Sequence, residues 1–320
     1  MLNEGVSKNC ILLGKGIFFR SLKQFLKGWE MSFQGNIKGL PQEEFLFSMK
    51  DEFLKKSTFQ RIFNKDFLNL DIYKYSLCFR DSIISKFKNM EITIDKLEDL
   101  HQFIDSDLKE YNFDDGVNKI SQQFYEMDEN FYQIYYNFLK YIQSNFFKFD
   151  FYFQKTPTIR LHTPKSPNNN HYPRYHSDIV YGHPPQEINI WVPLTPLDPL
   201  DHHGFKIMDV ENTYNIFNGY DFNFEKFIDS AIHDPQLTQR CHHMAQDVKT
   251  NFGEMLAFDS RCIHTGMPLM QKSRVSIDIR IIPRNEMDTL GITYQGKGRR
   301  KILFIPGESY HINSICEIIK

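Results

Sequence analysis

Two histidines and one aspartate are the residues of this chain best suited to metal chemistry. His176 and Asp178 stand two positions apart in Tyr175-His-Ser-Asp-Ile-Val180, and His264 follows much later, after Gly253-Glu-Met-Leu-Ala-Phe-Asp259. In an extended segment, side chains at positions i and i+2 point to the same side, so an imidazole and a carboxylate would lie side by side. Two histidines and one carboxylate are typical of non-haem Fe(II) sites with open coordination positions. Those positions suit a bidentate 2-oxo acid together with dioxygen.

A dicarboxylic 2-oxo acid would also need a cation for its far carboxylate, because an unpaired charge is costly in a pocket with little water. Arg274 lies ten residues after His264 and begins the segment Arg274-Val-Ser-Ile-Asp-Ile-Arg280. A guanidinium binds a carboxylate through two parallel hydrogen bonds, which a lysine cannot do. We therefore predict that Arg274 anchors the acid, with Ser276 as a further donor on the same face.

Polar and apolar residues alternate through three segments that we expect to be strands. They are 159–162, 187–192 and Arg274–Arg280. An antiparallel sheet with its polar face in water is the commonest source of such alternation. With a metal motif between these segments, we instead expect the polar faces to line a barrel mouth and the apolar faces to pack under helices. Strand parity and nearness to the motif make four residues candidates for substrate contact. They are Arg160, Tyr181, Glu187 and Arg280.

The predicted strands all lie in the second half of the chain, where prolines and β-branched residues replace a helical pattern. They are Thr156–His162, Glu187–Leu194, Gly204–Val210, Gly253–Asp259 and Arg274–Pro283. Before them, apolar residues recur at helical spacing from Phe124 to Ile142, which predicts an amphipathic helix. We expect three regions: a mainly helical part at 1–115, a core at 116–285 with an inserted loop or lid at about 211–250, and a C-terminal extension at 286–320 that packs on the core.

Composition argues against several classes of protein. The formal net charge is −2 among 24% charged residues, so no global electrostatic attraction to nucleic acid is expected. The longest apolar stretch near the start, 11–19, is interrupted by Lys15 and is shorter than the roughly 18 residues of a membrane-spanning helix. Five scattered cysteines indicate neither a disulfide framework nor a zinc knuckle. We expect a cytoplasmic protein without nucleic-acid or membrane partners, acting on a small molecule.

The ordered set of motifs resembles the Fe(II)/2-oxoglutarate-dependent dioxygenase superfamily, in particular its phytanoyl-CoA-hydroxylase-like branch and the StrG-type bacterial biosynthetic oxygenases. The resemblance spans roughly residues 120–283. The segments that carry it are 158–162, 175–178, 181–183, 187–195, 253–259 and 274–280. It implies an α+β protein with a double-stranded β-helix (jelly-roll) core, covered by helices from a largely α N-terminal half.

The resemblance also implies roles for particular residues. His176, Asp178 and His264 would bind Fe(II), Arg274 would form the salt bridge to 2-oxoglutarate, and Asn189 would be a weaker co-substrate contact. Dioxygen would be the oxidant, with succinate and CO₂ as co-products and ascorbate as a supporting reductant. Halogenating relatives have a small residue in place of the carboxylate at 178, so hydroxylation or a related oxidation is favoured.

Three functions stay open at this point. The leading one is hydroxylation of a small metabolite or biosynthetic intermediate. The second is hydroxylation of a protein or peptide side chain, with the N-terminal half as a docking module. The third is a cupin-like metal-binding protein or sugar isomerase that does not use oxygen; such proteins usually carry more ligating histidines and do not need Arg274. The sequence leaves the oligomeric state open.

Overall fold

A computed structural model describes residues 49–104, 111–112, 117–164, 174–197, 204–267, 271–287 and 309–319. The chain divides into two compact units, 1–45 and 46–320, and every described element belongs to the second. The parts of the predicted terminal regions at 1–48 and 288–308 therefore lie outside the described residues. The described helices include none that is both long and apolar enough to cross a membrane.

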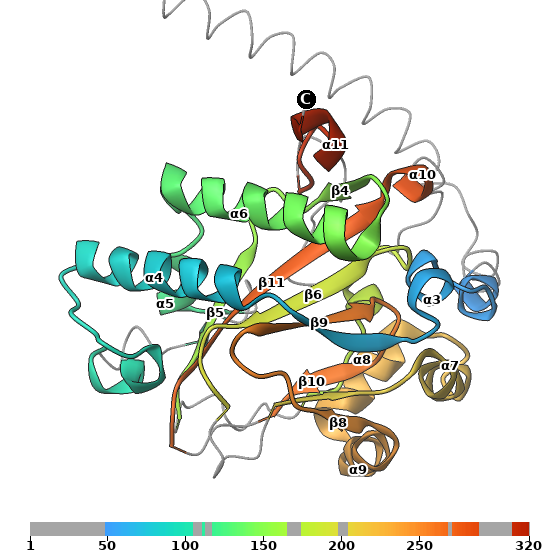
Figure 1. The fold of residues 1–320 in the computed structure, drawn as a ribbon. Coiled ribbons are helices and arrows are strands. Elements are labelled where there is room, and N and C mark those ends of the chain that lie inside the picture. Colours follow the sequence, from blue (N-terminus) through green and yellow to red (C-terminus); the bar gives the residue numbers. More distant parts are fainter. Residues whose placement is uncertain are drawn as a thin grey trace, which may run out of the picture. The chain divides into compact units, whose positions relative to one another are not determined.

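The largest antiparallel sheet among the described residues forms the centre of this unit (Figure 1). Its order is β1-β9-β6-β11-β4, and β5 also pairs with β11. The strands are β1 (Phe67–Asp71), β4 (Phe151–Phe153), β5 (Thr158–His162), β6 (Ile188–Pro193), β9 (Glu254–Asp259) and β11 (Arg274–Pro283). The predicted bounds of β11 are therefore confirmed, and β5, β6 and β9 lie within the predicted ranges.

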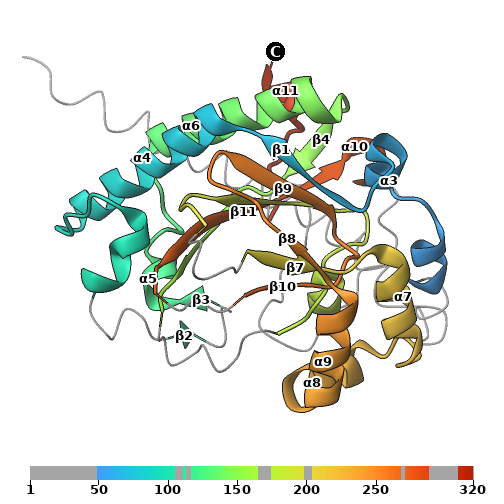
Figure 2. The same cartoon turned by 60° about the horizontal axis from the view of Figure 1, so that its bottom comes forward.

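A smaller sheet lies on the side of the large sheet away from helices α4 and α6 (Figure 2). It contains β7 (Phe205–Ile207), β8 (Gln246–Val248) and β10 (His264–Gly266), in the order β10-β7-β8. An isolated antiparallel bridge joins His176 to His264 at the free edge of β10. The two histidines thereby become neighbours although 88 positions separate them in the sequence.

Helices α4 (Tyr73–Asn89) and α6 (Glu129–Ile142) cover the apolar face of the large sheet (Figure 1). Their buried aromatic residues form one core with the apolar side chains of β5, β6 and β11. The residues of β11 in this core are Val275, Ile277, Ile279 and Ile281, all fully buried. The expectation that helices cover the apolar faces is confirmed, and the polar faces point toward the small sheet.

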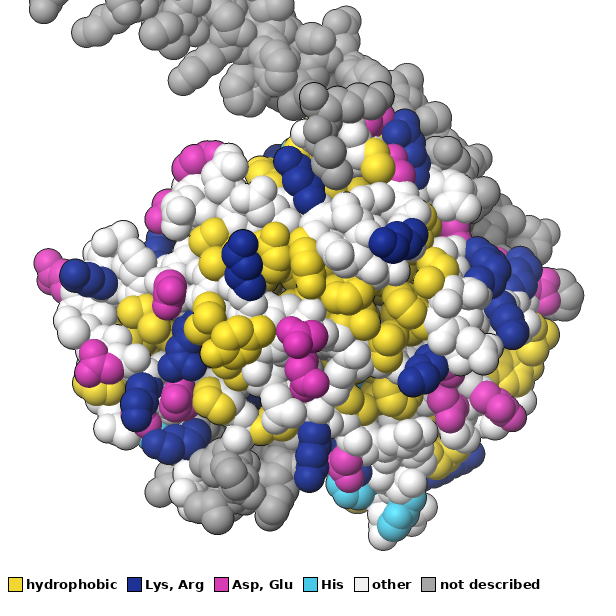
Figure 3. Space-filling view, in the orientation of Figure 1, with side chains coloured by type: hydrophobic (Ala, Val, Ile, Leu, Met, Phe, Trp, Pro, Cys, Tyr) yellow, Lys and Arg dark blue, Asp and Glu magenta, His cyan; other side chains and the backbone are white. Residues whose placement is uncertain are grey.

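The helical side of the unit, formed by α4 and α6, has a hydrophobic surface. Apolar side chains gather there over α4, α6 and β1 (Figure 3). Partly buried residues that pack against the core include Leu70, Tyr75 and Tyr141.

Helix α6 is shorter than the predicted amphipathic stripe. It begins after Asp128, whose side chain accepts a hydrogen bond from the backbone N–H of Phe131 at 2.8 Å. Phe124 is fully buried but lies before this cap, outside the helix. The spacing of apolar residues therefore predicted which face of α6 is buried. The start of the helix is set by the capping side chain of Asp128.

The predicted insertion at 211–250 contains helices between two strands of the small sheet. They are α7 (Val210–Asn218), α8 (Phe224–His233) and α9 (Pro235–Met244). Helix α8 contacts the 3₁₀ helix η5 (Asp178–Tyr181), so the insertion lies against the short helix that begins at Asp178. Its action as a lid stays a prediction.

Further described elements are short. They include α3 (Thr58–Phe63), η1 (Leu97–Gln102), β2 (Tyr111–Asn112), β3 (Val117–Asn118), α5 (Lys119–Gln122), the π-helix η3 (Gln143–Phe147), α10 (Arg284–Met287) and α11 (Ile315–Ile319).

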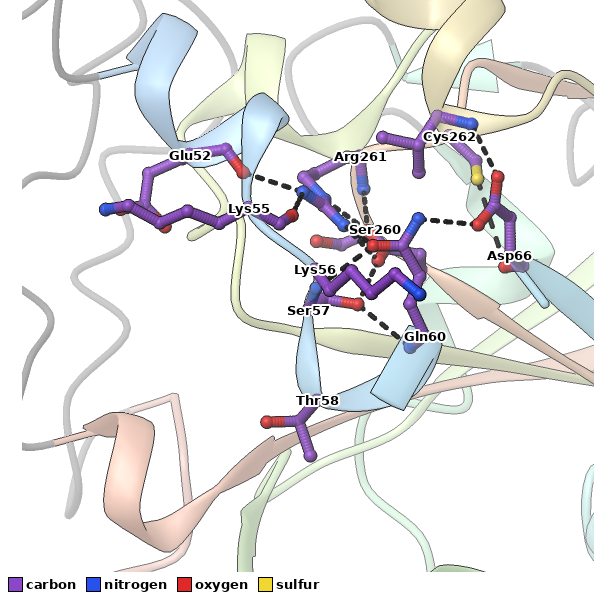
Figure 4. Close-up of polar contacts among 12 residues, drawn as sticks. Glu52, Lys55, Lys56, Ser57, Thr58, Gln60, Asp66, Ser260, Arg261 and Cys262 are labelled. Atoms are coloured by element: carbon purple, nitrogen blue, oxygen red, sulfur yellow. Dashed lines mark hydrogen bonds and ion pairs between the residues drawn. The ribbon is translucent and has the colours of Figure 1, made fainter. Parts of the chain in front are cut away.

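Arg261 ties the start of the described chain to the turn that precedes His264 (Figure 4). Its guanidinium contacts both carboxylate oxygens of Asp259 at 2.8 Å and donates to the backbone carbonyls of Glu52 and Lys55 at 2.7 and 2.9 Å. Both members of the ion pair are buried. A buried charge is tolerated when its partner and all its hydrogen bonds are present, which is the case here.

Replacement of Arg261 by alanine is expected to lower the free energy of unfolding by about 3–5 kcal/mol, because Asp259 is left as an uncompensated buried charge. Urea denaturation checks this through the transition midpoint. Arg284→Ala is the matched control, since the ion pair of Arg284 with Asp150 is partly exposed. Similar losses in the two variants would contradict the role assigned to Arg261.

Candidate metal centre

His176, Asp178 and His264 meet between the two sheets. One potential ligand atom from each lies within 4.8 Å of the other two. Asp178 Oδ1 is 3.8 Å from His176 Nε2 and 4.0 Å from His264 Nε2. Three donor atoms at this mutual distance can hold one divalent metal ion on a single face, as predicted from the sequence.

Both imidazoles are oriented by backbone carbonyls. His176 Nδ1 lies 3.0 Å from the carbonyl oxygen of Arg174, and His264 Nδ1 lies 3.0 Å from that of Cys262. A carbonyl accepts a hydrogen bond from the ring, which places the proton on Nδ1 and the lone pair on Nε2. Burial, followed by the nearby His264, lowers the pKa of His176 to about 3. Burial also lowers the pKa of His264. Neutral imidazoles are the form that binds metal.

The backbone around His176 and Asp178 is extended over a shorter stretch than the sequence argument assumed. The chain is extended at Ser177 and then turns into η5, which begins at Asp178 itself. The Ser177 hydroxyl accepts from the backbone N–H of Ile179 at 3.4 Å, and Gly182 ends the turn with a φ of 96°. A left-handed conformation of this kind favours glycine. The extended Ser177 still directs the flanking side chains to one side, so the i, i+2 argument holds locally.

The second oxygen of Asp178 is occupied by protein donors. Oδ2 accepts hydrogen bonds from Arg280 Nε at 2.9 Å, Arg280 Nη2 at 2.7 Å and Asn189 Nδ2 at 3.1 Å. Arg280 and Asn189 stand opposite each other on β11 and β6. Burial alone would raise the pKa of Asp178, but Arg280 and the nearby histidines lower it well below its usual value. Asp178 is therefore ionised, with Oδ1 directed at the histidines.

A buried polar network supports Arg280 from behind. Glu187 Oε2 lies 3.9 Å from Arg280 Nε and 2.9 Å from His183 Nδ1. Tyr310, from the C-terminal segment, donates its hydroxyl to Glu187 Oε1. The sequence placed Arg280 and Glu187 on the correct face but did not anticipate these partners. Their predicted role as substrate contacts stays a prediction.

Arg274 is buried at the other end of β11's polar face. Its Nη1 donates to the carbonyl oxygens of Met267 at 3.1 Å and Gly204 at 3.4 Å. The guanidinium also lies directly beside Gly266, where an added Cβ would stand 2.7 Å from Arg274 Nη2. Gly266 follows His264 by two positions on β10, a separation of about 7 Å along a strand. Arg274 is thus next to the metal-ligand cluster but outside it.

The other predicted site residues lie around this centre. Ser276 is buried on the same strand face as Arg274. Arg160 on β5 forms an ion pair with Asp278. The Tyr181 ring centroid is 5.5 Å from that of His176. Phe205 stacks on His264 with ring centroids 5.3 Å apart, which fixes the plane of that imidazole. The structure therefore brings all the predicted ligands together, with the predicted anchor beside them.

Comparisons with known proteins return only distant similarities to solved structures. No family model matches the sequence, and no curated protein matches it. Similar solved structures include the non-haem α-ketoglutarate-dependent carbocyclase SnoK from nogalamycin biosynthesis, with 10% identity, a TM-score of 0.41 and coverage of 77% of this chain and 85% of that one. A viral collagen prolyl hydroxylase from Paramecium bursaria Chlorella virus-1 has 13% identity, a TM-score of 0.36 and coverage of 69% and 92%.

A nickel complex of the non-haem monooxygenase ThoJ has 11% identity and a TM-score of 0.35, with coverage of 71% of this chain and 77% of that one. The viral prolyl hydroxylase has also been solved as a complex with 2-oxoglutarate. Such low identities and TM-scores decide neither activity nor substrate, so the functional argument depends on the site itself.

Proposed function

We propose that this chain is an Fe(II)- and 2-oxoglutarate-dependent oxygenase of the phytanoyl-CoA-hydroxylase-like type. The observation that carries the proposal is the cluster of His176, Asp178 and His264, with all three ligand atoms within 4.8 Å of one another. In this proposal the three residues hold the metal, and Arg274 with Ser276 binds the far carboxylate of 2-oxoglutarate. Asn189 holds Asp178 and is proposed as a weaker co-substrate contact.

The donor set fits Fe(II). Two neutral imidazoles and one carboxylate oxygen make a facial set with positions left for other ligands. Iron bound there would supply dioxygen activation coupled to the oxidative decarboxylation of 2-oxoglutarate to succinate and CO₂. The protein's contribution is to orient both imidazoles through Nδ1 and to hold Asp178 by one oxygen, so that only Oδ1 faces the ion.

The arrangement of strands supports a double-stranded β-helix for the core. The order β5-β11-β6-β9 on one side faces β10-β7-β8, with the His176 bridge extending the small sheet on the β10 edge. Two facing antiparallel sheets of this kind are what a jelly roll contains.

The position of Gly266 supports the assignment of Arg274 to the co-substrate. Gly266→Ala is expected to displace the guanidinium, because the new Cβ would lie 2.7 Å from Nη2. The KM for 2-oxoglutarate should rise roughly tenfold, equivalent to about 1.4 kcal/mol of lost binding, while metal affinity stays unchanged. Gly219→Ala, at the end of α7 and away from the site, is the control. An unchanged KM in Gly266→Ala would argue against this position for the co-substrate.

The proposed reaction is hydroxylation of a small molecule. Arg160, Tyr181, Glu187 and Arg280 remain the proposed substrate contacts, with the qualification that Glu187 and Arg280 already have buried protein partners. Arg160 likewise forms an ion pair with Asp278, and the Tyr181 ring lies against that of His176. A cupin-like metal-binding protein or sugar isomerase would not need an arginine such as Arg274 beside the metal ligands.

Uncoupled turnover tests the proposal. Iron-loaded protein incubated with 2-oxoglutarate, ascorbate and air is expected to release succinate faster than buffer with iron alone. His176→Ala is expected to reduce the rate to that background. Succinate release no faster than the background in the wild type would exclude the proposed activity.

A further inference from the structure

We infer that Tyr310, from the C-terminal segment, is a positioning residue for the metal centre and acts through Glu187 and Arg280 on Asp178. The inference rests on the metal site proposed above. It adds a contribution from a segment more than forty positions beyond the last metal ligand.

The backbone on both sides of Tyr310 is fixed to β4. The carbonyl of Ser309 accepts from the N–H of Lys155 at 2.8 Å, and the N–H of His311 donates to the carbonyl of Phe153 at 2.8 Å. Tyr310 itself forms an antiparallel bridge with Gln154. Its side chain is buried and its hydroxyl donates to Glu187. The tyrosine is therefore a rigid attachment point.

Each oxygen of Glu187 has its own partner. Tyr310 occupies Oε1, and His183 occupies Oε2 at 2.9 Å. These contacts hold the carboxylate where Oε2 is 3.9 Å from Arg280 Nε. All the side chains involved are more than nine-tenths buried. If Glu187 lost one of these hydrogen bonds, a buried carboxylate oxygen would be left without a donor, which is unfavourable in free energy. Glu187 is therefore expected to shift toward another donor.

Arg280 depends on this support. Within the part of the chain that the structure describes, its Nη1 is buried without a hydrogen-bond partner, and only Nε and Nη2 hold Asp178. A shift of Glu187 would change the electrostatic balance around the guanidinium and let it move. Asp178 would then no longer be held with only Oδ1 directed at the metal position. Partners of this kind behind a ligand typically affect metal affinity by roughly 10–100-fold.

Titration of the full-length wild type and its variants with Mn(II), a redox-stable stand-in for Fe(II), tests the inference. Tyr310→Phe keeps the ring and removes the hydroxyl, and it is expected to weaken Mn(II) binding roughly threefold to tenfold, less than a direct partner of the ligand. Glu187→Gln should weaken it at least as much. If Tyr310 acts through Glu187, the double variant should bind no more weakly than Glu187→Gln alone.

Tyr135→Phe is the matched control. Its hydroxyl is also buried and donates to a backbone carbonyl, that of Gln154, at 2.7 Å, in the same neighbourhood but away from Glu187. It should bind Mn(II) as the wild type does. Equal affinities for Tyr310→Phe and Tyr135→Phe, or additive losses in the double variant, would overturn the inference and leave the proposed function intact. A wild type that binds no Mn(II) would overturn both.

Discussion

Asp178→Asn is expected to reduce metal affinity by more than the 10–100-fold typical of residues behind a ligand, although the new side chain has nearly the same shape. Three donors, two from Arg280 and one from Asn189, point at Oδ2. The amide oxygen of the variant must take that position, because its NH₂ group cannot accept a hydrogen bond. The NH₂ group then faces His176 and His264, and it has no lone pair to offer a metal ion.

Isothermal titration with Mn(II) or anaerobic Fe(II) measures this effect. Asp278→Asn is the matched control, since Asp278 is a carboxylate on β11 and is also paired with an arginine. It lies outside the ligand cluster and should bind metal normally. If Asp178→Asn kept the affinity of the wild type, Asp178 would not be a ligand.

Arg274→Met is expected to lower the affinity for 2-oxoglutarate by at least about a hundredfold without weakening metal binding. Removal of one member of a buried, hydrogen-bonded charge pair typically costs about 2–5 kcal/mol. Arg274 is buried beside Gly266, and its Nη1 donates to the backbone carbonyls of Met267 and Gly204. In the proposed site its guanidinium lies beside β10, where the far carboxylate of 2-oxoglutarate would bind. Arg280 instead forms an ion pair with Asp178.

Arg280→Met, in contrast, is expected to weaken metal binding. This variant leaves Asp178 and Glu187 as buried carboxylates without their cation, so metal affinity and stability should both fall. Weak metal binding in Arg280→Met and weak 2-oxoglutarate binding in Arg274→Met can be measured on the same preparations. If Arg280→Met lost 2-oxoglutarate affinity while Arg274→Met did not, the two roles would have to be exchanged.

Strands β5, β6, β7, β9 and β11 were predictable because each buried face has a simple physical cause, whereas β1 and β4 of the same large sheet were not predicted. Val275, Ile277 and Ile279 alternate with polar residues, and only a strand buries such a set on one face. The helices at 210–244 were harder to place, because the segment is polar and lacks a long apolar stripe. Their starts did carry local signals, since Asp209, Asn223 and Asp234 each cap a helix.

The candidate metal site also contains residues that the sequence predicted and contacts that it did not. Its ligands follow from the residue types and the short spacing of His176 and Asp178. The support behind them could not be deduced, because strand parity gives the face of Arg280 but neither its depth nor its partners. The contact between Tyr310 and Glu187 joins residues 123 positions apart and depends on where the C-terminal segment meets β4. Long-range contacts of this type leave no periodic signal in the sequence.

Anaerobic titration of the Fe(II)-loaded protein with 2-oxoglutarate, followed by visible absorption, tests the central claim most directly. Chelation of the iron by the 2-oxo acid while His176, Asp178 and His264 hold the other face should produce a charge-transfer band that saturates with 2-oxoglutarate. The band should be absent in Asp178→Asn and should require much higher concentrations in Arg274→Met. A wild-type protein that binds Fe(II) but develops no such band at saturating 2-oxoglutarate would contradict the proposed function.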